Sequence, residues 1–181
     1  MRARHVLAAV AAVIGAAVGG FATVGPASAS GWGTDVRADL FQLINTGTDQ
    51  CADLSLDDPT GTAVVQQPCT EKTGGSQVWL AQPLATDPLN VQLVNQARGL
   101  CMDLLDGEFA DGTPVVLARC TPKLVSQRWQ ILAGAVPGPL RIVNRAFGQC
   151  LEVRDGSLER GAPIQVSACA EVTAHQVWRK I

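Results

Sequence analysis

Short segments in which every second residue is apolar recur from residue 40 onward, and Gly, Pro, Asp and Asn separate them. These segments cover residues 41–44, 51–54, 63–66, 77–80, 91–94, 101–104, 114–118, 127–131, 140–143, 150–153, 163–167 and 176–181. A period of two is typical of half-buried β-strands. No window of ten or more residues beyond residue 40 has the helical period of 3.6. The sequence therefore predicts an all-β domain.

The segments repeat as three units with a common frame. Each unit has an alternating apolar run, a cysteine followed two residues later by an acid, a glycine, a second cysteine and a final Gln-x-Trp. Asn45, Asn95 and Asn144 each stand six residues before the first cysteine of a unit, and the Trp residues of successive Gln-x-Trp motifs are 50 and 49 residues apart. Such a period indicates an array of one supersecondary unit. We divide the domain, residues 40–181, into repeats 40–89, 90–138 and 139–181.

Three units of four strands each restrict the architecture. Propellers have four or more blades, so three units would not close into one. Twelve short strands in three equivalent units fit a β-trefoil, in which three hairpins cap a six-stranded barrel. Threefold symmetry then predicts three core layers, one member from each repeat. They are Phe41/Val91/Leu140, Leu43/Leu93/Ile142 and Trp79/Trp129/Trp178.

All six cysteines lie in the repeats, two in each. Six cysteines allow 15 pairings, but identical units should form identical bonds. Symmetry therefore predicts Cys51–Cys69, Cys101–Cys120 and Cys150–Cys169. Each bond would close a loop of about 19 residues, worth roughly 3 kcal/mol in the chain-entropy account. Metal binding is the alternative, but the pairs lack C-x-x-C spacing and histidine is scarce. We expect no metal and no cofactor.

The first 29 residues have the features of a secretory signal peptide. Two Arg residues precede a stretch rich in Ala and Gly, and small residues at 27–29 suit a cleavage site. A membrane anchor is the alternative, but the stretch is weakly hydrophobic and is broken at Gly25-Pro26. We expect cleavage near Ala29, no membrane span afterwards and an extracellular location. Residues 30–39 are polar and Gly-rich, and we interpret them as a flexible lead-in.

Removal of the signal segment takes away two Arg residues and no acid, so the formal net charge changes from −2 to −4. An acidic domain without a Lys/Arg cluster is not expected to bind nucleic acid.

The frame of C-x-D/E-L/V, Gly, Cys and Q-x-W, present three times in register, resembles the ricin B-chain type (R-type) lectin domain. The resemblance covers residues 40 to 181. It implies a carbohydrate-binding β-trefoil. The Trp residues of the Q-x-W motifs are expected in the core, with each N–H bonded to a partner, while each Gln ties neighbouring backbone.

The resemblance also implies a sugar site in each repeat. In the family, the acid of C-x-D accepts hydrogen bonds from neighbouring sugar hydroxyls, because a carboxylate offers two oxygens at about diol spacing. The matching acids are Asp53, Asp103 and Glu152. A solvated loop carboxylate beside a cysteine is the alternative interpretation.

Two further family positions differ from the family pattern here. An Asn precedes the Gln of Q-x-W in the family, and the matching residues are Ser76, Ser126 and His175. An aromatic platform stands two residues before the second cysteine, and the matching residues are Gln67, Ala118 and Ser167. The chain has no Tyr, and its Phe residues stand at strand or core-like positions. We therefore predict up to three weak sites, the second repeat being the best.

Catalysis has little support in the sequence. His175 has no Ser or Cys partner in a nucleophile motif. Asp103, Asp106, Glu108 and Asp111 could imitate a glycosidase pair, but lectin loops and Asp-Gly turns explain them with fewer assumptions. Two non-enzymatic functions compete: a secreted lectin that binds glycans, including galactose-like sugars, and a trefoil that binds a protein partner, as the ricin-like subunits of cytolethal distending toxins imply.

Overall fold

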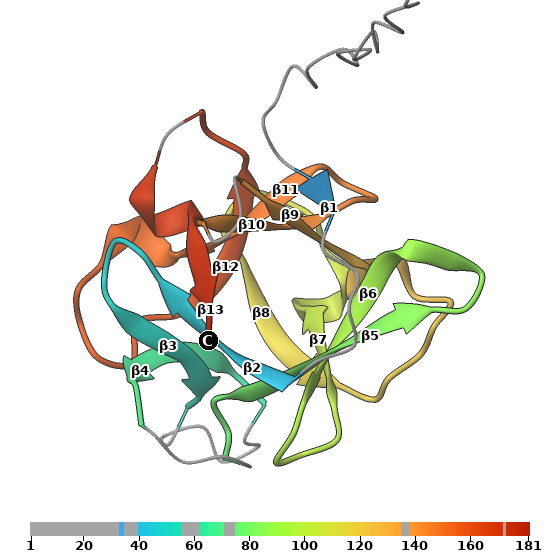
Figure 1. Cartoon of the computed structure of the whole chain (residues 1–181), viewed down its shortest axis with the longest axis horizontal. Coiled ribbons are helices and arrows are strands. Elements are labelled where there is room, and N and C mark those ends of the chain that lie inside the picture. The colour runs from blue at the N-terminus through green and yellow to red at the C-terminus, as the bar shows by residue number, and fades with distance from the viewer. Residues whose placement is uncertain (1–32, 35–39, 56–61, 71–74, 135–137, 172) are drawn as a thin grey trace, which may run out of the picture.

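The three sequence repeats are three four-stranded units in a computed structural model of the chain (Figure 1). The structure describes residues 33–34, 40–55, 62–70, 75–134, 138–171 and 173–181. The first repeat contains β2 (Leu40–Asn45), β3 (Gln50–Leu54), β4 (Val64–Pro68) and β5 (Val78–Leu84). The second contains β6 (Asp87–Asn95), β7 (Cys101–Leu104), β8 (Thr113–Ala118) and β9 (Trp129–Ala133). The third contains β10 (Leu140–Asn144), β11 (Gln149–Val153), β12 (Ile164–Ala168) and β13 (Trp178–Lys180).

Six of these strands form a closed antiparallel ring. β2 pairs with β5, β5 with β6, β6 with β9, β9 with β10, β10 with β13, and β13 returns to β2. The other six form the hairpins β3–β4, β7–β8 and β11–β12. β8 pairs with β12, and single bridges join Ala63 to Val116 and Val65 to Pro163, so each hairpin unit is linked to both others. The predicted β-trefoil is confirmed.

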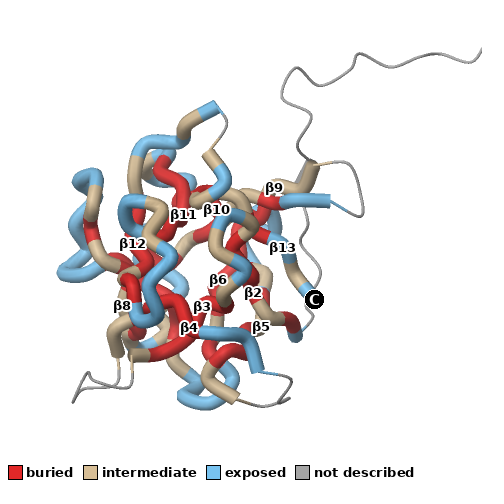
Figure 2. The backbone as a smooth tube through the Cα atoms, turned by 90° about the vertical axis from the view of Figure 1, so that its left-hand side faces the viewer, coloured by how far each residue is buried: buried red, intermediate tan, exposed pale blue. Residues whose placement is uncertain are grey.

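The core lies between this ring and the three hairpins, and buried segments of all three repeats contribute to it (Figure 2). All nine residues of the predicted layers are buried, and the three Trp rings are completely inaccessible to solvent. Each indole N–H donates to a backbone carbonyl of its own repeat. The bonds run from Trp79 to Ala52 (3.1 Å), from Trp129 to Met102 (3.1 Å) and from Trp178 to Leu151 (2.9 Å). The core assignment of the Q-x-W tryptophans is therefore confirmed.

Three buried Asn side chains join each repeat to the one before it. Each donates from Nδ2 to the carbonyl of the residue that precedes the Gln of Q-x-W. The pairs are Asn45 with His175 (2.8 Å), Asn95 with Ser76 (2.7 Å) and Asn144 with Ser126 (3.1 Å). The first pair links the third repeat back to the first, so the chain of contacts is cyclic.

The three predicted disulfides are present, each within one repeat. They are Cys51–Cys69, Cys101–Cys120 and Cys150–Cys169. Two Asp-Gly pairs form turns between the second and third strands of their repeats. Asp106 and Gly107 have φ angles of 56° and 69° and belong to the 3₁₀ turn η1 (Leu105–Gly107). Asp155 and Gly156 have φ angles of 55° and 61° in η3 (Arg154–Gly156). Gly adopts this left-handed region freely, and Asp is among the few other residues that enter it.

Some details differ from the sequence-based expectations. The lead-in contains the short strand β1 (Gly33–Thr34), which pairs with Ala133 and Leu132 of β9. The division at residues 89 and 90 falls inside β6, because β5 and β6 form one long hairpin across the two repeats. The turns η2 (Val125–Gln127) and η4 (Ala174–Gln176) were not expected.

The proposed signal segment, residues 1–29, lies outside the described residues, as do residues 30–32 and 35–39. Within the described ranges, no helix has the length and apolar character needed to cross a membrane.

Replacing Trp129 with Ala should lower the free energy of unfolding by about 3–5 kcal/mol, because it removes a fully buried ring and leaves the Met102 carbonyl without its donor. Urea unfolding monitored by circular dichroism measures the change. Lys123→Ala, at an exposed position of the same repeat, is the control. Equal stability of the two variants would contradict the core assignment.

Candidate functional site

The three acids that match the family's sugar-binding position lie on the outward face of the hairpin strands. Asp53 is in β3, Asp103 in β7 and Glu152 in β11, and the residues on either side of each acid belong to the core. Because side chains alternate along a strand, each acid points away from the core. Their exposed fractions are only 8%, 7% and 6%. These acids are therefore not solvated loop carboxylates.

The Gln of each Q-x-W motif holds the acid of its own repeat. Gln77 donates to Asp53 Oδ2 (2.9 Å), Gln127 to Asp103 Oδ2 (2.8 Å) and Gln176 to Glu152 Oε2 (2.8 Å). The same amide also bonds the backbone on both sides of the second cysteine. In the second repeat it donates to the Arg119 carbonyl (2.9 Å) and accepts from the Thr121 N–H (2.8 Å). The predicted backbone role of Gln is confirmed, and its contact with the acid is an additional finding.

The three carboxylates differ in the hydrogen bonds that they already accept. Asp103 Oδ1 accepts the Leu104 N–H (2.8 Å) and Oδ2 accepts Gln127, and Asp53 has the same two kinds of partner. A carboxylate has about four acceptor positions. About two positions on Asp103 therefore remain for a ligand, which is the number that a sugar diol needs.

Glu152 has less capacity left, about one acceptor position. Its Oε1 accepts both the Gln165 amide (2.8 Å) and the Ser167 hydroxyl (2.6 Å), while Oε2 accepts Gln176. His175 Nε2 lies a further 3.6 Å from Oε2. Donors from its own repeat therefore surround this carboxylate.

The space next to the acid also differs between the second and third repeats. In the third repeat the His175 ring packs against the η3 turn, and a Cβ placed on Gly156 would lie 3.3 Å from His175 Nδ1. The equivalent of His175 in the second repeat is the small Ser126, and a Cβ on Gly107 would meet no atom within 4 Å. The second site is open where His175 fills the third.

The residues at the platform position are not aromatic, and each has a different environment. Gln67 is buried, and its Oε1 accepts a hydrogen bond from Arg160 Nε of the third repeat (2.9 Å). Ser167 bonds Glu152, as described above, and Ala118 is half-buried. Ser76, in the first repeat, is half-buried and its carbonyl accepts Asn95. The loop at residues 56–61, beyond Asp53, lies outside the described residues.

Phe109 corrects the expectation that every Phe stands at a strand or core-like position. It is 59% exposed in the loop between β7 and β8, and it stacks on Phe147 of the third repeat with ring centroids 4.2 Å apart. The sequence signal was its place two residues after the Asp106-Gly107 turn. Stacking on Phe147 occupies one of its faces.

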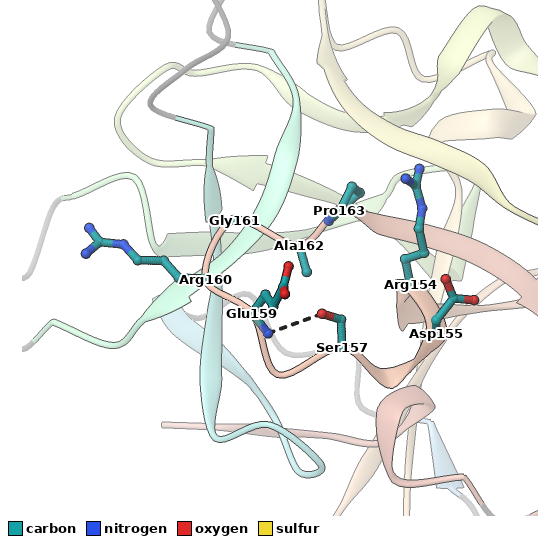
Figure 3. A pocket seen from close by; sticks show the side chains of 8 residues that line it. All are labelled: Arg154, Asp155, Ser157, Glu159, Arg160, Gly161, Ala162 and Pro163. Carbon is teal, nitrogen blue, oxygen red and sulfur yellow. Dashed lines mark hydrogen bonds between the residues drawn. The ribbon is translucent and has the colours of Figure 1, made fainter.

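A cavity of about 270 Å³ lies inside the loop between β11 and β12 (Figure 3). Its lining consists of Arg154, Asp155, Ser157, Glu159, Arg160, Gly161, Ala162 and Pro163. Buried Gln66 holds the loop by donating to the carbonyls of Ser157 (2.7 Å) and Glu159 (2.8 Å). Glu152 is not part of the lining, so the cavity is separate from the acid site.

Within the described residues, no cluster of three or more His, Cys, Asp or Glu side chains is placed to hold a metal ion.

The sequence profile of the family described as "Ricin-type beta-trefoil lectin domain" matches residues 39–178. This chain therefore belongs to the ricin-type β-trefoil lectin domain family. Comparison with curated protein sequences finds no match.

Solved structures with the same fold include designed and natural proteins. The designed threefold-symmetric protein ThreeFoil is 20% identical, with 78% of this chain and 97% of that one covered and a TM-score of 0.69. The Macrolepiota procera ricin B-like lectin, solved with lactose, is 21% identical over 81% of this chain and 98% of that one (TM-score 0.67). The C-half of the earthworm R-type lectin, solved with GalNAc, is 10% identical over 78% and 96% (TM-score 0.58). At these identities the likeness shows the shared fold.

Replacing Gln127 with Ala should destabilise the protein by at least about 2 kcal/mol, because the Asp103 carboxylate and two backbone groups lose buried partners. Denaturant unfolding of the variant against Gln96→Ala, at an exposed position, measures this cost. If both variants unfolded at the same denaturant concentration, the Gln–acid contact would contribute nothing to folding.

Proposed function

We propose that this protein is a secreted, non-catalytic glycan-binding module whose best sugar site is in the second repeat. The observation that carries the proposal is the Asp103 carboxylate, which is held by Gln127 and has about two acceptor positions free, with the small Ser126 where the third repeat has His175. Adjacent sugar hydroxyls can donate to these positions. Family membership supports carbohydrate as the ligand class.

The bound sugars of two structural relatives, lactose and GalNAc, make galactose-like sugars the first ligands to test. A single site should be weak. Ala118 offers no ring for stacking, and the loss of about 50 Å² of apolar contact at ~25 cal/mol/Å² costs roughly 1 kcal/mol, which is several-fold in affinity.

Useful retention on a polysaccharide would then require more than one site. Asp53 accepts the same two kinds of hydrogen bond as Asp103, so the first repeat provides the other sugar site. Two linked sites can raise the apparent affinity by about 10² or more when one glycan spans both.

Blocking the second site should abolish most of the binding. Ser126→His introduces into the second repeat the imidazole ring that His175 provides in the third. Asp103→Asn removes the charged acceptor. Each variant should bind an immobilised glycan, chosen from an array, at least tenfold more weakly. Glu152→Gln should change binding less than twofold. Thermal melting verifies that each variant is folded.

The outcomes separate the two competing functions. Equal binding by Asp103→Asn and Glu152→Gln would place the sugar elsewhere. An array without any glycan hit at high protein concentration would favour the protein-partner interpretation.

Opening the third repeat should create a new site. In the Ser126→His background, the pair His175→Ser and Ser167→Ala removes the ring beside Oε2 and frees one position on Oε1 of Glu152, while Gln176 still bonds Oε2. We expect binding to the same immobilised glycan to return in part, as measured by surface plasmon resonance. Continued absence of binding would show that closure by these two side chains is not what silences the third repeat.

A further inference from the structure

Three aliphatic side chains flank the free acceptor of the second repeat. Val116 stands directly opposite Asp103 in the β7–β8 pair, and Ala118 stands two residues further along β8. Leu105 follows Asp103 by two residues and is 41% exposed. In an antiparallel pair, opposite and diagonal neighbours on one face lie within side-chain reach. Leu105, Val116 and Ala118 are called the aliphatic wall below.

The third repeat shows that two of these positions face the acid and that the third contacts one of the two. The residues equivalent to Val116 and Ala118 are Gln165 and Ser167, and both donate to Glu152 Oε1. The residue equivalent to Leu105 is Arg154, whose Nε donates to Gln165 Oε1 (3.1 Å). All three positions are thus polar in the third repeat and aliphatic in the second.

An aliphatic wall beside a carboxylate discriminates between sugars. A hydroxyl placed against the wall would lose water without gaining a partner, which is unfavourable. A methyl group in the same place would bury apolar surface, which is favourable. Ring hydroxyls at the other edge of the sugar would still reach Asp103.

We propose that the second repeat selects 6-deoxyhexoses, whose methyl group lies on the aliphatic wall while two neighbouring hydroxyls bond Asp103. The inference rests on the proposed glycan-binding function and specifies the ligand class for the same site. Arg154, Gln165 and Ser167 give the third repeat no such preference.

Two matched sugar pairs test the selectivity, since the members of each pair differ only at C6. The pairs are D-galactose with D-fucose and L-galactose with L-fucose, titrated into the full mature chain and followed by NMR chemical shifts. In at least one pair the 6-deoxy sugar should bind about threefold or more tightly, which is the effect of burying one group of CH₂ size. Asp103→Asn should remove this binding.

Substitution of the wall provides the second arm. Leu105→Arg installs the residue of the third repeat and should bring the affinities of the two sugars within a factor of two. Leu158→Arg is the matched control, because Leu158 occupies the third-repeat loop and is 72% exposed; it should keep the full preference. Neither substitution alters a core residue, and thermal melting checks the fold.

Three results would overturn the inference. The first is Asp103-dependent binding in which the parent sugar equals or exceeds its 6-deoxy partner in both pairs. The second is tighter binding of GalNAc than of D-galactose, when neither 6-deoxy sugar binds more tightly than its parent. The third is an unchanged preference in Leu105→Arg. If the unmodified protein showed no sugar binding that depends on Asp103, the proposed function itself would be overturned, and the ligand class with it.

Discussion

The hydrogen bond from each Q-x-W glutamine to the acid of its own repeat is the interaction on which the rest of the structure depends. A carboxylate that is more than nine-tenths buried destabilises the fold unless donors surround it. The glutamine amide supplies one donor and at the same time bonds the backbone around the second cysteine. Acid, disulfide and last strand therefore form one rigid unit. The acceptor is in place before any ligand arrives, so binding does not have to order it.

The same constraint explains how the repeats can differ in function while sharing a fold. Core packing and the glutamine contacts restrict the inward face of each hairpin and the acid. They do not restrict the outward neighbours of the acid. Ser126 and His175 occupy equivalent places, yet Ser126 is small and the ring of His175 lies 3.6 Å from its acid. Under the proposed function, divergence at these outward positions would change the ligand without a cost to the core.

The fold was predictable because its determinants are local and occur three times. The strand alternation, the Trp layers and the disulfides all follow from residues that recur at fixed spacing. The state of each site was not predictable, because it depends on contacts across strands and between loops. Nothing in the spacing shows that Ser167 and Gln165 bond Glu152, that His175 packs on Gly156, or that Phe109 stacks on Phe147. The pairing of Gly33–Thr34 with β9 likewise has no counterpart in the repeat frame.

The closing of the barrel by β13 against β2 has a consequence for the rate of folding. Asn45 and His175, whose hydrogen bond belongs to this junction, are 130 residues apart in the chain. The entropy lost in closing so long a loop is not offset until the final strand is paired. Domains dominated by such distant pairings fold in milliseconds to seconds, far more slowly than helical bundles. Partly folded chains with an open barrel, and hence with unpaired edges of β2 and β10, are therefore the species in which intermolecular pairing and aggregation compete with folding.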